Sequence, residues 1–229
     1  MTPIIGITTY RNLKDGGHFL PGGYVESVHK AGGIPVLLAS GKTDMERILQ
    51  SVDGLIFAGG GDINPAVYGG PAHPSIDRVD PVRDTFEIEL AKRVFNSTIP
   101  VLGICRGFQL LALASGGELI THIPDEFGEK IKHKAADGES IKHSVQVEEN
   151  SQLAIITGRT KFEVESKHHQ AIRKISDDWQ VTAKSDDGII EAIENKKHPW
   201  MISVLWHPEM SLDDLNQQGI FKGLVKASR

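Results

Sequence analysis

The sequence predicts an α/β fold in which helices cover both faces of a mostly parallel central sheet. In the first half of the chain, short apolar runs alternate with amphipathic segments, and repeated strand–helix alternation is typical of a parallel sheet. In the second half, short strand-like runs follow one another closely, which predicts a small antiparallel β addition. Because the chain has 229 residues, residues 1–229 are expected to form a single domain.

The first half supplies the predicted parallel strands and the helices that connect them. Thr43, with Glu46 three residues later, resembles a capping box that opens one helix. Asp80 and Pro81 mark the start of another helix, because an acidic N-cap followed by proline at the first helical position is favoured. Strands are expected at residues 4–8, 35–39, 54–58 and 100–104, and helices at residues 24–31, 43–51, from 80 onward, and 107–115.

The second half is predicted to contain short strands, one hairpin and a closing helix. Residues 185–188 have the composition of a hairpin turn. Residues 121–140 are rich in Lys, His, Asp and Gly, which predicts a long surface loop. Strands are expected at residues 144–147, 155–157, 162–164, 180–183, 189–193 and 201–205, and the closing helix at residues 212–225.

The composition limits the classes of protein to which the chain can belong. The net charge is -5 and no run of Lys or Arg occurs, so a nucleic-acid partner is not expected. No segment approaches the roughly 18 apolar residues that span a bilayer, and the apolar N-terminus has no basic leader, so neither a membrane partner nor a signal peptide is expected. The one cysteine cannot form an intramolecular disulfide, which suits a cytoplasmic location.

Cys105 lies in the most informative segment of the sequence. An apolar strand at residues 100–104 leads into Gly103-Ile104-Cys105-Arg106-Gly107, and a predicted helix follows at once. This is the pattern of a nucleophile elbow with Cys in place of Ser, in which flanking glycines permit a sharp turn that exposes the nucleophile. The helix N-terminus also favours the thiolate. The alternative is a buried structural cysteine at a tight turn.

His207 and Glu209 are the candidate base and its orienting group. His207 follows a predicted buried strand at its C-terminal end, which is the edge where open α/β sheets place ligands. Glu209 is close enough in sequence to hold the imidazole in one tautomer, which would complete a Cys-His-Glu triad. A histidine that merely caps the turn is the alternative.

The glycine-rich segment at residues 59–62 is a candidate oxyanion site. The N–H groups of Gly60 or Gly61, together with that of Arg106, are expected to hold a developing oxyanion. A phosphate-binding loop is the weaker alternative, because neither of the common glycine-rich phosphate motifs fits this segment.

These elements, in this order, resemble the class I glutamine amidotransferase superfamily, whose flavodoxin-like fold matches the predicted architecture. The resemblance covers nearly the whole chain. Finer features resemble the γ-glutamyl-γ-aminobutyrate hydrolase group, a branch of peptidase family C26. The segments that carry this resemblance are GGGDINP from Gly59, DPVRDTFE from Asp80, GICRGFQ from Gly103, HHQAI from His168 and WHPE from Trp206.

The resemblance implies an acyl transfer through a γ-glutamyl thioester on Cys105. It implies γ-glutamyl-γ-aminobutyrate as a representative small-molecule substrate. The implied metabolic setting is polyamine (putrescine) catabolism. It assigns substrate-binding roles to Gln109, His169 and Gln170. No cofactor is implied. One departure is Glu165, which stands where the family pattern has Asn. This residue either faces the pocket and alters which amine is accepted, or is a solvated strand residue.

Other groups of polar residues are possible sites. Arg83, Asp84 and Glu87 open one helix. Arg83 and Glu87, four residues apart, either simply pair across a helical turn or, as the family resemblance implies, help organise the site. Asp62 and Asn64 are expected either to recognise the substrate's α-amino group or to shape a turn. The histidines lack the spacing of known zinc motifs, so no metal is expected; those considered are His122, His133, His143, His168 and His169.

Three functions remain open at this stage. The leading hypothesis is a stand-alone γ-glutamyl hydrolase that uses water as the acceptor. The second is a glutaminase subunit that delivers ammonia to a separate synthetase, and the third is a binding protein that kept the fold and lost turnover. The sequence does not fix the oligomeric state and leaves a homodimer open.

Overall fold

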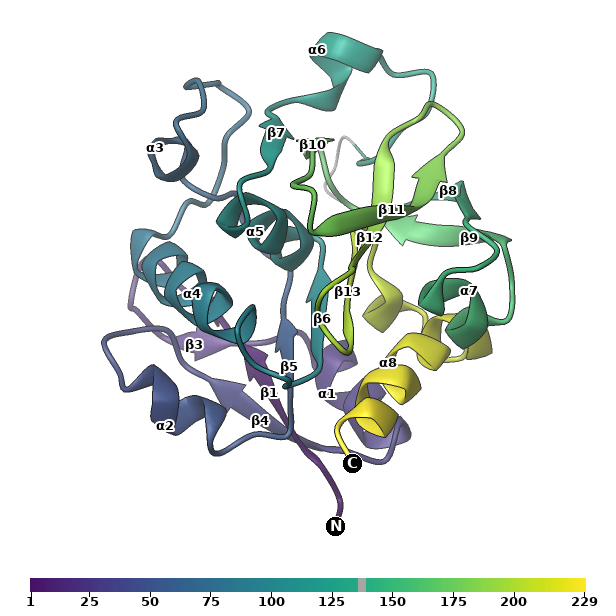
Figure 1. Cartoon of the computed structure of the whole chain (residues 1–229). Helices are drawn as coiled ribbons and strands as arrows, with labels where there is room; N and C mark the ends of the chain where they lie inside the picture. Colours follow the sequence, from purple (N-terminus) through teal and green to yellow (C-terminus); the bar gives the residue numbers. More distant parts are fainter. Residues whose placement is uncertain (136–138) are drawn as a thin grey trace.

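The computed structural model describes residues 1–135 and 139–229 of the chain. One large sheet runs through the molecule, with helices on both of its faces (Figure 1). The predicted fold class is therefore confirmed. Among the described residues, no helix has both the length and the apolar character needed to cross a membrane.

The parallel half of the sheet contains five strands whose residues are largely buried. The outermost strand, β4, is the exception and exposes several side chains. Such apolar runs are expected where helices cover both faces of a sheet. In spatial order the strands are β4 (Ile34–Leu38), β1 (Ile4–Thr8), β5 (Gly54–Phe57), β6 (Val101–Ile104) and β13 (Met201–Val204).

The antiparallel half continues the same sheet beyond β13. It is larger than the small addition expected from the sequence, because short strands at residues 118–120 and 171–174 also join it. The strands that follow β13 are β12 (Ile190–Asn195), β11 (Trp179–Ser185), β8 (Ile141–Val147) and β9 (Lys161–Ser166), and β10 (Ala171–Lys174) pairs with β12 and with β7 (Glu118–Ile120). The predicted hairpin turn between β11 and β12 is confirmed, with Gly188 at a φ of 90°.

Two hydrophobic clusters hold the helices against the sheet. One cluster joins one sheet face to α1 (Gly22–Lys30), α7 (Gln152–Thr157) and α8 (Leu215–Ala227). The other joins the opposite face to α2 (Met45–Leu49), α4 (Pro81–Val94) and α5 (Arg106–Ala114). The remaining short elements are β2 (Tyr10–Arg11), β3 (His18–Phe19), α3 (Pro65–Tyr68), α6 (Ile123–Phe127) and η1 (Pro208–Met210).

Helix α4 shows how the sequence fixes one of these helices. The Asp80 side chain accepts hydrogen bonds from the N–H groups of Val82 and Arg83, and Pro81 occupies the first helical position. These contacts satisfy N–H groups that have no partner within the helix. The predicted start of this helix is confirmed.

Three local predictions were wrong or incomplete. Asp44, and not Thr43, caps α2, because its carboxylate accepts from the N–H of Arg47. Residues 155–157 lie in a helix instead of a strand, since the Ser151 hydroxyl caps α7 and Gly158 ends it in the left-handed conformation. The predicted loop at residues 121–140 contains α6 and the buried His133, and residues 136–138 of it lie outside the described part.

Replacing Asp80 should destabilise α4. We expect Asp80→Ala to lower the free energy of unfolding by about 1 kcal/mol, because two N–H groups lose their acceptor. Asp80→Asn is the matched control: it also loses the 3.5 Å ion pair with Arg11 but keeps a capping oxygen. Urea denaturation of the three proteins measures the difference, and equal stability of the Ala and Asn variants would contradict the capping role.

Candidate active site

Cys105 occupies a sharp turn between β6 and α5. Its backbone has a φ of 51° and a ψ of -106°, a conformation that is costly for a residue with a side chain. Its N–H donates to the Val204 carbonyl at 2.9 Å, and its carbonyl accepts from the N–H of Gln109 at 3.1 Å. The strand, the turn and the helix are those of the predicted nucleophile elbow.

The glycines on either side of Cys105 are required by close packing. A Cβ atom at Gly107 would lie 2.0 Å from the Phe57 carbonyl oxygen. A Cβ atom at Gly103 would lie 2.6 Å from the Ser203 hydroxyl. Since real Cβ atoms do not approach so closely, the helix can follow the strand at this distance only with glycine at these positions.

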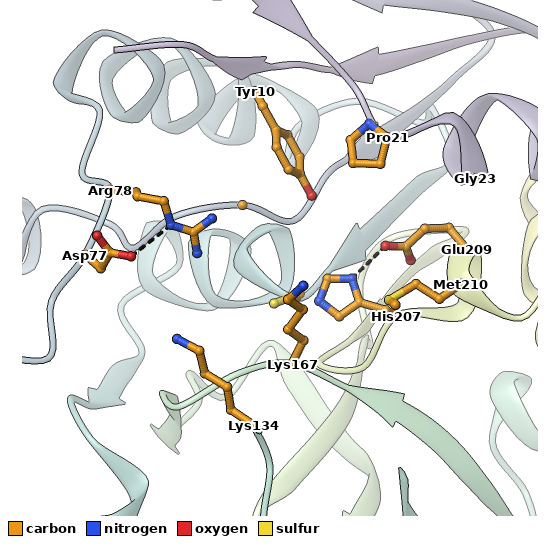
Figure 2. Close-up of a pocket in the computed structure, with 12 residues that line it drawn as sticks. Tyr10, Pro21, Gly23, Asp77, Arg78, Lys134, Lys167, His207, Glu209 and Met210 are labelled. Atoms are coloured by element: carbon orange, nitrogen blue, oxygen red, sulfur yellow. Dashed lines mark hydrogen bonds and ion pairs between the residues drawn. The ribbon is translucent and has the colours of Figure 1, made fainter. Parts of the chain in front are cut away.

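His207 and Glu209 lie at the end of the neighbouring strand β13 and are both buried. The Nδ1–H of His207 donates to Glu209 Oε1 at 2.6 Å, as Figure 2 shows. The other ring nitrogen, Nε2, takes no part in that bond, and His207 and Cys105 line the same cavity. The structure therefore brings together the three residues predicted to form the triad.

The charge state of His207 follows from these contacts. Burial alone would lower its pKa, but the carboxylate of Glu209 and the contact with Cys105 outweigh burial and hold the pKa of His207 well above its ordinary value. An imidazolium is thus favoured beside the sulfur. An imidazolium at this position has a proton that it can give to a leaving group.

The predicted oxyanion donors come from the loop that follows β5 and from the start of α5. Gly60 lines the same cavity as Cys105 and has a φ of 139°. Arg106 is the first residue of α5, where N–H groups have no partner within the helix. Gly61 lies instead beside a neighbouring hollow, and the N–H of Gly59 donates to the Tyr24 hydroxyl at 2.9 Å. An oxyanion role for Gly60, Gly61 and Arg106 stays a prediction.

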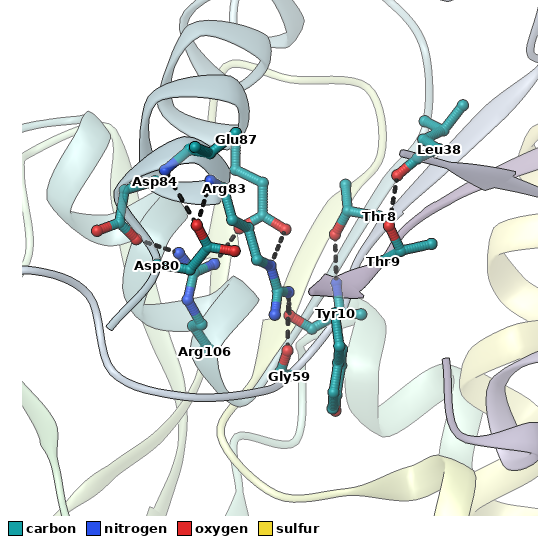
Figure 3. A network of polar contacts seen from close by, with 12 residues as sticks. Thr8, Thr9, Tyr10, Leu38, Gly59, Asp80, Arg83, Asp84, Glu87 and Arg106 are labelled. Carbon is teal, nitrogen blue, oxygen red and sulfur yellow. Dashed lines mark hydrogen bonds and ion pairs between the residues drawn. The ribbon is translucent and has the colours of Figure 1, made fainter. Parts of the chain in front are cut away.

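A buried ion network fixes the glycine-rich loop against the elbow (Figure 3). Glu87 pairs with both Arg83 and Arg106, and Arg106 also pairs with Asp84. Arg83 donates to the carbonyls of Ala58 at 2.9 Å and Gly59 at 2.8 Å. Burial alone would raise the pKa of Glu87, but the two guanidinium groups lower it below its ordinary value. The expected Arg83–Glu87 pair is confirmed, with a wider role than the sequence indicated.

A cavity of about 640 Å³ opens in front of Cys105 and His207. Three cationic side chains line it, as Figure 2 shows: Arg78, Lys134 and Lys167. Arg78 pairs with Asp77 at 3.0 Å, whereas neither lysine forms an ion pair with another described residue. The other lining residues are Tyr10, Pro21, Gly23, Gly60, Asp77, Glu209 and Met210.

The three predicted substrate-binding residues lie outside the lining of this cavity. The Gln109 amide donates to the Gln170 carbonyl at 3.3 Å, and both side chains are buried. His169 contacts Asp62 through Nε2 at 3.1 Å and His122 through Nδ1 at 3.1 Å. The substrate-binding roles of Gln109, His169 and Gln170 stay predictions.

Three further polar residues singled out in the sequence have structural partners. Asn64 caps α3 by accepting from the Ala66 N–H, and Asp62 accepts from the Asp77 N–H. Both contacts fit the interpretation that these residues shape turns. Glu165 pairs with Lys142 on the adjacent strand at 3.4 Å and does not line the cavity that contains Cys105, which argues against a place in the pocket, although its side chain is only 17% exposed.

Sequence reasoning missed two tyrosines beside the triad. Tyr24 holds the glycine-rich loop through the Gly59 N–H, and its hydroxyl lies 3.4 Å from that of Tyr10. Burial, and then the nearby Glu209, raise the pKa of both hydroxyls above their ordinary value, so both stay protonated. No motif marks these residues, because their role depends on loops that meet only in the fold.

Comparison with known proteins shows the family to which the chain is similar. The peptidase C26 family model matches residues 3–209. A protein of Mycobacterium tuberculosis assigned to the glutamine amidotransferases is 38% identical over 99% of this chain and 75% of its own length. The γ-glutamyl-γ-aminobutyrate hydrolase of Escherichia coli (strain K12) is 30% identical over 98% of this chain and 93% of its own length.

A solved structure with the same fold is much more distant in sequence. It comes from Thermoplasma acidophilum and is named as a GMP synthase component. The alignment has a TM-score of 0.68 and 18% identity, and it covers 100% of this chain and 94% of that chain. This likeness concerns the fold alone.

The backbone strain at Cys105 can be measured. We expect Cys105→Gly to be more stable than Cys105→Ala by about 1 kcal/mol, because glycine tolerates a φ of 51° and alanine does not. Ala112→Gly, within helix α5, is the control of opposite sign and should destabilise by about 1 kcal/mol. Chemical denaturation provides the measurement, and an alanine variant as stable as the glycine variant would show that the turn is unstrained.

Proposed function

The chain belongs to the peptidase C26 family, and from this premise we propose that it hydrolyses γ-glutamyl amide bonds through Cys105, with γ-glutamyl-γ-aminobutyrate as the representative substrate. Family membership supports a glutamine amidotransferase-like amidohydrolase. The observation that carries the finer proposal is His207, which is hydrogen-bonded to Glu209 and lines the same cavity as Cys105 and three cationic side chains.

The first half of the proposed reaction transfers the glutamyl group to the enzyme. The Cys105 thiolate attacks the γ-carbonyl carbon, and the carbonyl oxygen becomes an oxyanion that the N–H groups of Gly60 and Arg106 stabilise. His207 gives its Nε2 proton to the amide nitrogen as the C–N bond breaks. The amine departs, and a γ-glutamyl thioester remains on Cys105.

The second half returns the enzyme to its starting state. His207, now neutral, removes a proton from water as the water oxygen attacks the thioester carbon. The tetrahedral intermediate collapses, the C–S bond breaks, and glutamate is released. The thiolate and the imidazolium are restored. Throughout the cycle Glu209 holds the Nδ1–H of His207, so that Nε2 alone exchanges protons.

The two lysines of the cavity indicate the chemistry of the leaving amine. Lys134 and Lys167 line the cavity that contains Cys105, and neither forms an ion pair with a described carboxylate, since Asp77 and Glu209 of the same cavity pair with Arg78 and His207. An amine that carries its own carboxylate, such as γ-aminobutyrate, would supply the missing negative charge. This supports a γ-glutamyl amino acid over a γ-glutamyl group bound to a neutral or cationic amine.

The second candidate is a glutaminase subunit that acts with a separate synthetase. It is favoured by relatives that carry glutamine amidotransferase names, including a glutamine amidotransferase-like protein of Rickettsia prowazekii that is 32% identical over 99% of this chain and 98% of its own length. The leaving group of glutamine is ammonia, which carries no carboxylate that could pair with the cavity lysines. The substrate measurements therefore separate the two candidates.

The first test combines labelling with turnover. We expect a glutamine-like electrophile to modify Cys105, as read by mass spectrometry, and the purified chain to release glutamate from γ-glutamyl-γ-aminobutyrate. Cys105→Ala should fold and show neither property. Turnover of glutamine alone would favour the glutaminase role. Absence of both labelling and turnover would make Cys105 structural and leave a binding protein.

The pH dependence of hydrolysis should report the pKa of His207. Because that pKa is raised in the folded protein, the imidazolium persists above the ordinary value of about 6.5 and is lost only as the pH rises through the higher value. Glu209→Gln removes one cause of the increase, so the alkaline limb of the kcat/KM profile should move to lower pH. An unmoved limb would rule out this electrostatic role.

The same variant also distinguishes the orienting group from the base. We expect Glu209→Gln to retain more turnover than His207→Ala, since the imidazole still exchanges protons when its orienting carboxylate is lost. Comparison of kcat at the optimum pH of each variant provides the measurement.

The cavity lysines should act on substrate selection. We expect Lys134→Ala and Lys167→Ala to raise KM for γ-glutamyl-γ-aminobutyrate by about 2–10-fold, because a partly exposed charge pair is lost. KM for glutamine should stay unchanged. Lys132→Ala is the matched control, since Lys132 is an exposed neighbour that does not line this cavity. Equal effects on both substrates would contradict recognition of a carboxylate on the amine.

A further inference from the structure

Three histidines and a glutamate converge in the antiparallel half of the sheet, away from the triad. His133 precedes β8, His143 lies on β8, His168 follows β9, and Glu191 lies on β12. All four side chains are buried, and each offers one donor atom within 4.8 Å of the others. The distances to Glu191 Oε1 are 3.3 Å from His133 Nδ1, 3.4 Å from His143 Nε2 and 3.6 Å from His168 Nε2.

The outer nitrogen of each histidine already has a partner that fixes the ring. His133 Nε2 contacts the Asp187 carboxylate at 3.0 Å. His143 Nδ1 contacts the Ser144 carbonyl at 3.3 Å, and His168 Nδ1 contacts the Gln170 carbonyl at 3.1 Å. Since all three partners are oxygen acceptors, each outer nitrogen carries the proton. In its neutral form, each ring would then present the lone pair of its inner nitrogen to the centre of the cluster.

The polar atoms at the centre of the cluster lie close together without aligned hydrogen bonds. The inner nitrogens of the three histidines and both carboxylate oxygens of Glu191 have no correctly aligned hydrogen bond to any described residue. Leaving a buried carboxylate and three lone pairs unpartnered is costly in free energy. A cation at the centre would satisfy all of them at once.

We propose that His133, His143, His168 and Glu191 bind a divalent transition-metal ion, with zinc as the best match. Imidazole nitrogen and carboxylate oxygen are both ligands that zinc accepts, and four protein ligands suffice for a closed tetrahedral site. Ligands about 2.0–2.1 Å from zinc lie about 3.3–3.4 Å apart at the corners of a tetrahedron. The observed nitrogen–oxygen distances of 3.3–3.6 Å are close to this spacing, and all four donor atoms lie within 4.8 Å of one another.

The outer contacts strengthen the assignment. Metal-bound histidines commonly donate their second N–H to a carboxylate or a backbone carbonyl, and each of the three histidines does so here. Calcium and magnesium prefer oxygen ligands, so a set dominated by imidazole nitrogen argues against them.

The proposed ion would stabilise the wall of the catalytic cavity. In the sequence, His133 is next to Lys134 and His168 is next to Lys167, and both lysines line that cavity. The His168 N–H also donates to the His133 carbonyl at 3.0 Å, so the two segments already lie side by side. The ion would hold these segments at a fixed separation. This inference does not depend on the activity proposed above, because its tests measure metal content and stability.

Metal analysis of the full chain is the first test. The protein is stripped with a chelator, titrated with zinc chloride alone, and examined by inductively coupled plasma mass spectrometry after gel filtration. We expect about one zinc per chain. At about 100 times its Kd, zinc should raise Tm by about 5–10 °C. Cobalt(II) in place of zinc should give the visible absorption of a tetrahedral site.

Variants then assign the ion to these residues. Glu191→Gln and His143→Ala should each lose stoichiometric zinc and the zinc-dependent rise in Tm. His198→Gln is the matched control, since His198 is also buried but lies outside the cluster, and it should keep both. If a cluster variant does not fold, the titration of the wild-type protein still tests whether the chain binds zinc. Wild-type protein that takes up no stoichiometric zinc and shows no rise in Tm, or variants that retain both, would overturn the proposal.

Discussion

The position of the Cys105 sulfur depends on one constrained turn of the backbone. A φ of 51° is unfavourable for cysteine, so the surrounding structure must hold it. The close contacts of Gly103 and Gly107 allow strand β6 and helix α5 to meet, and the Arg106 side chain ties the helix to Glu87. The geometry of the site therefore rests on packing and buried charge that lie outside the triad itself.

The two halves of the sheet contribute differently to the site. The parallel half places Cys105 after β6 and His207 after the adjacent β13, so their proximity follows from strand order. The antiparallel half supplies Lys134 and Lys167, which line the cavity from loops around β8 and β9. In the proposed enzyme, the parallel half of the sheet positions the residues that react, and the antiparallel half supplies the lysines that select the amine.

The features predicted from the sequence are those with local causes. The elbow glycines, the Asp80 cap and the two-residue step from His207 to Glu209 all act over short stretches of chain. The segment at residues 155–157 was misassigned because its apolar run is short, and the Ser151 cap that makes it helical lies outside that run. No metal was expected at the histidines because they lack the spacing of zinc motifs, and the cluster forms only when β12, β11, β8 and β9 assemble side by side.

The carboxylate of Glu87 has a further consequence, because it binds both Arg83 and Arg106. Arg83 holds the carbonyls of the glycine-rich loop, and Arg106 opens the elbow helix, so the two halves of the predicted oxyanion site share one anchor. In the proposed enzyme, donors anchored in this way would be preorganised for the reacting oxygen. Substrate binding should therefore require little reorganisation of this part of the molecule.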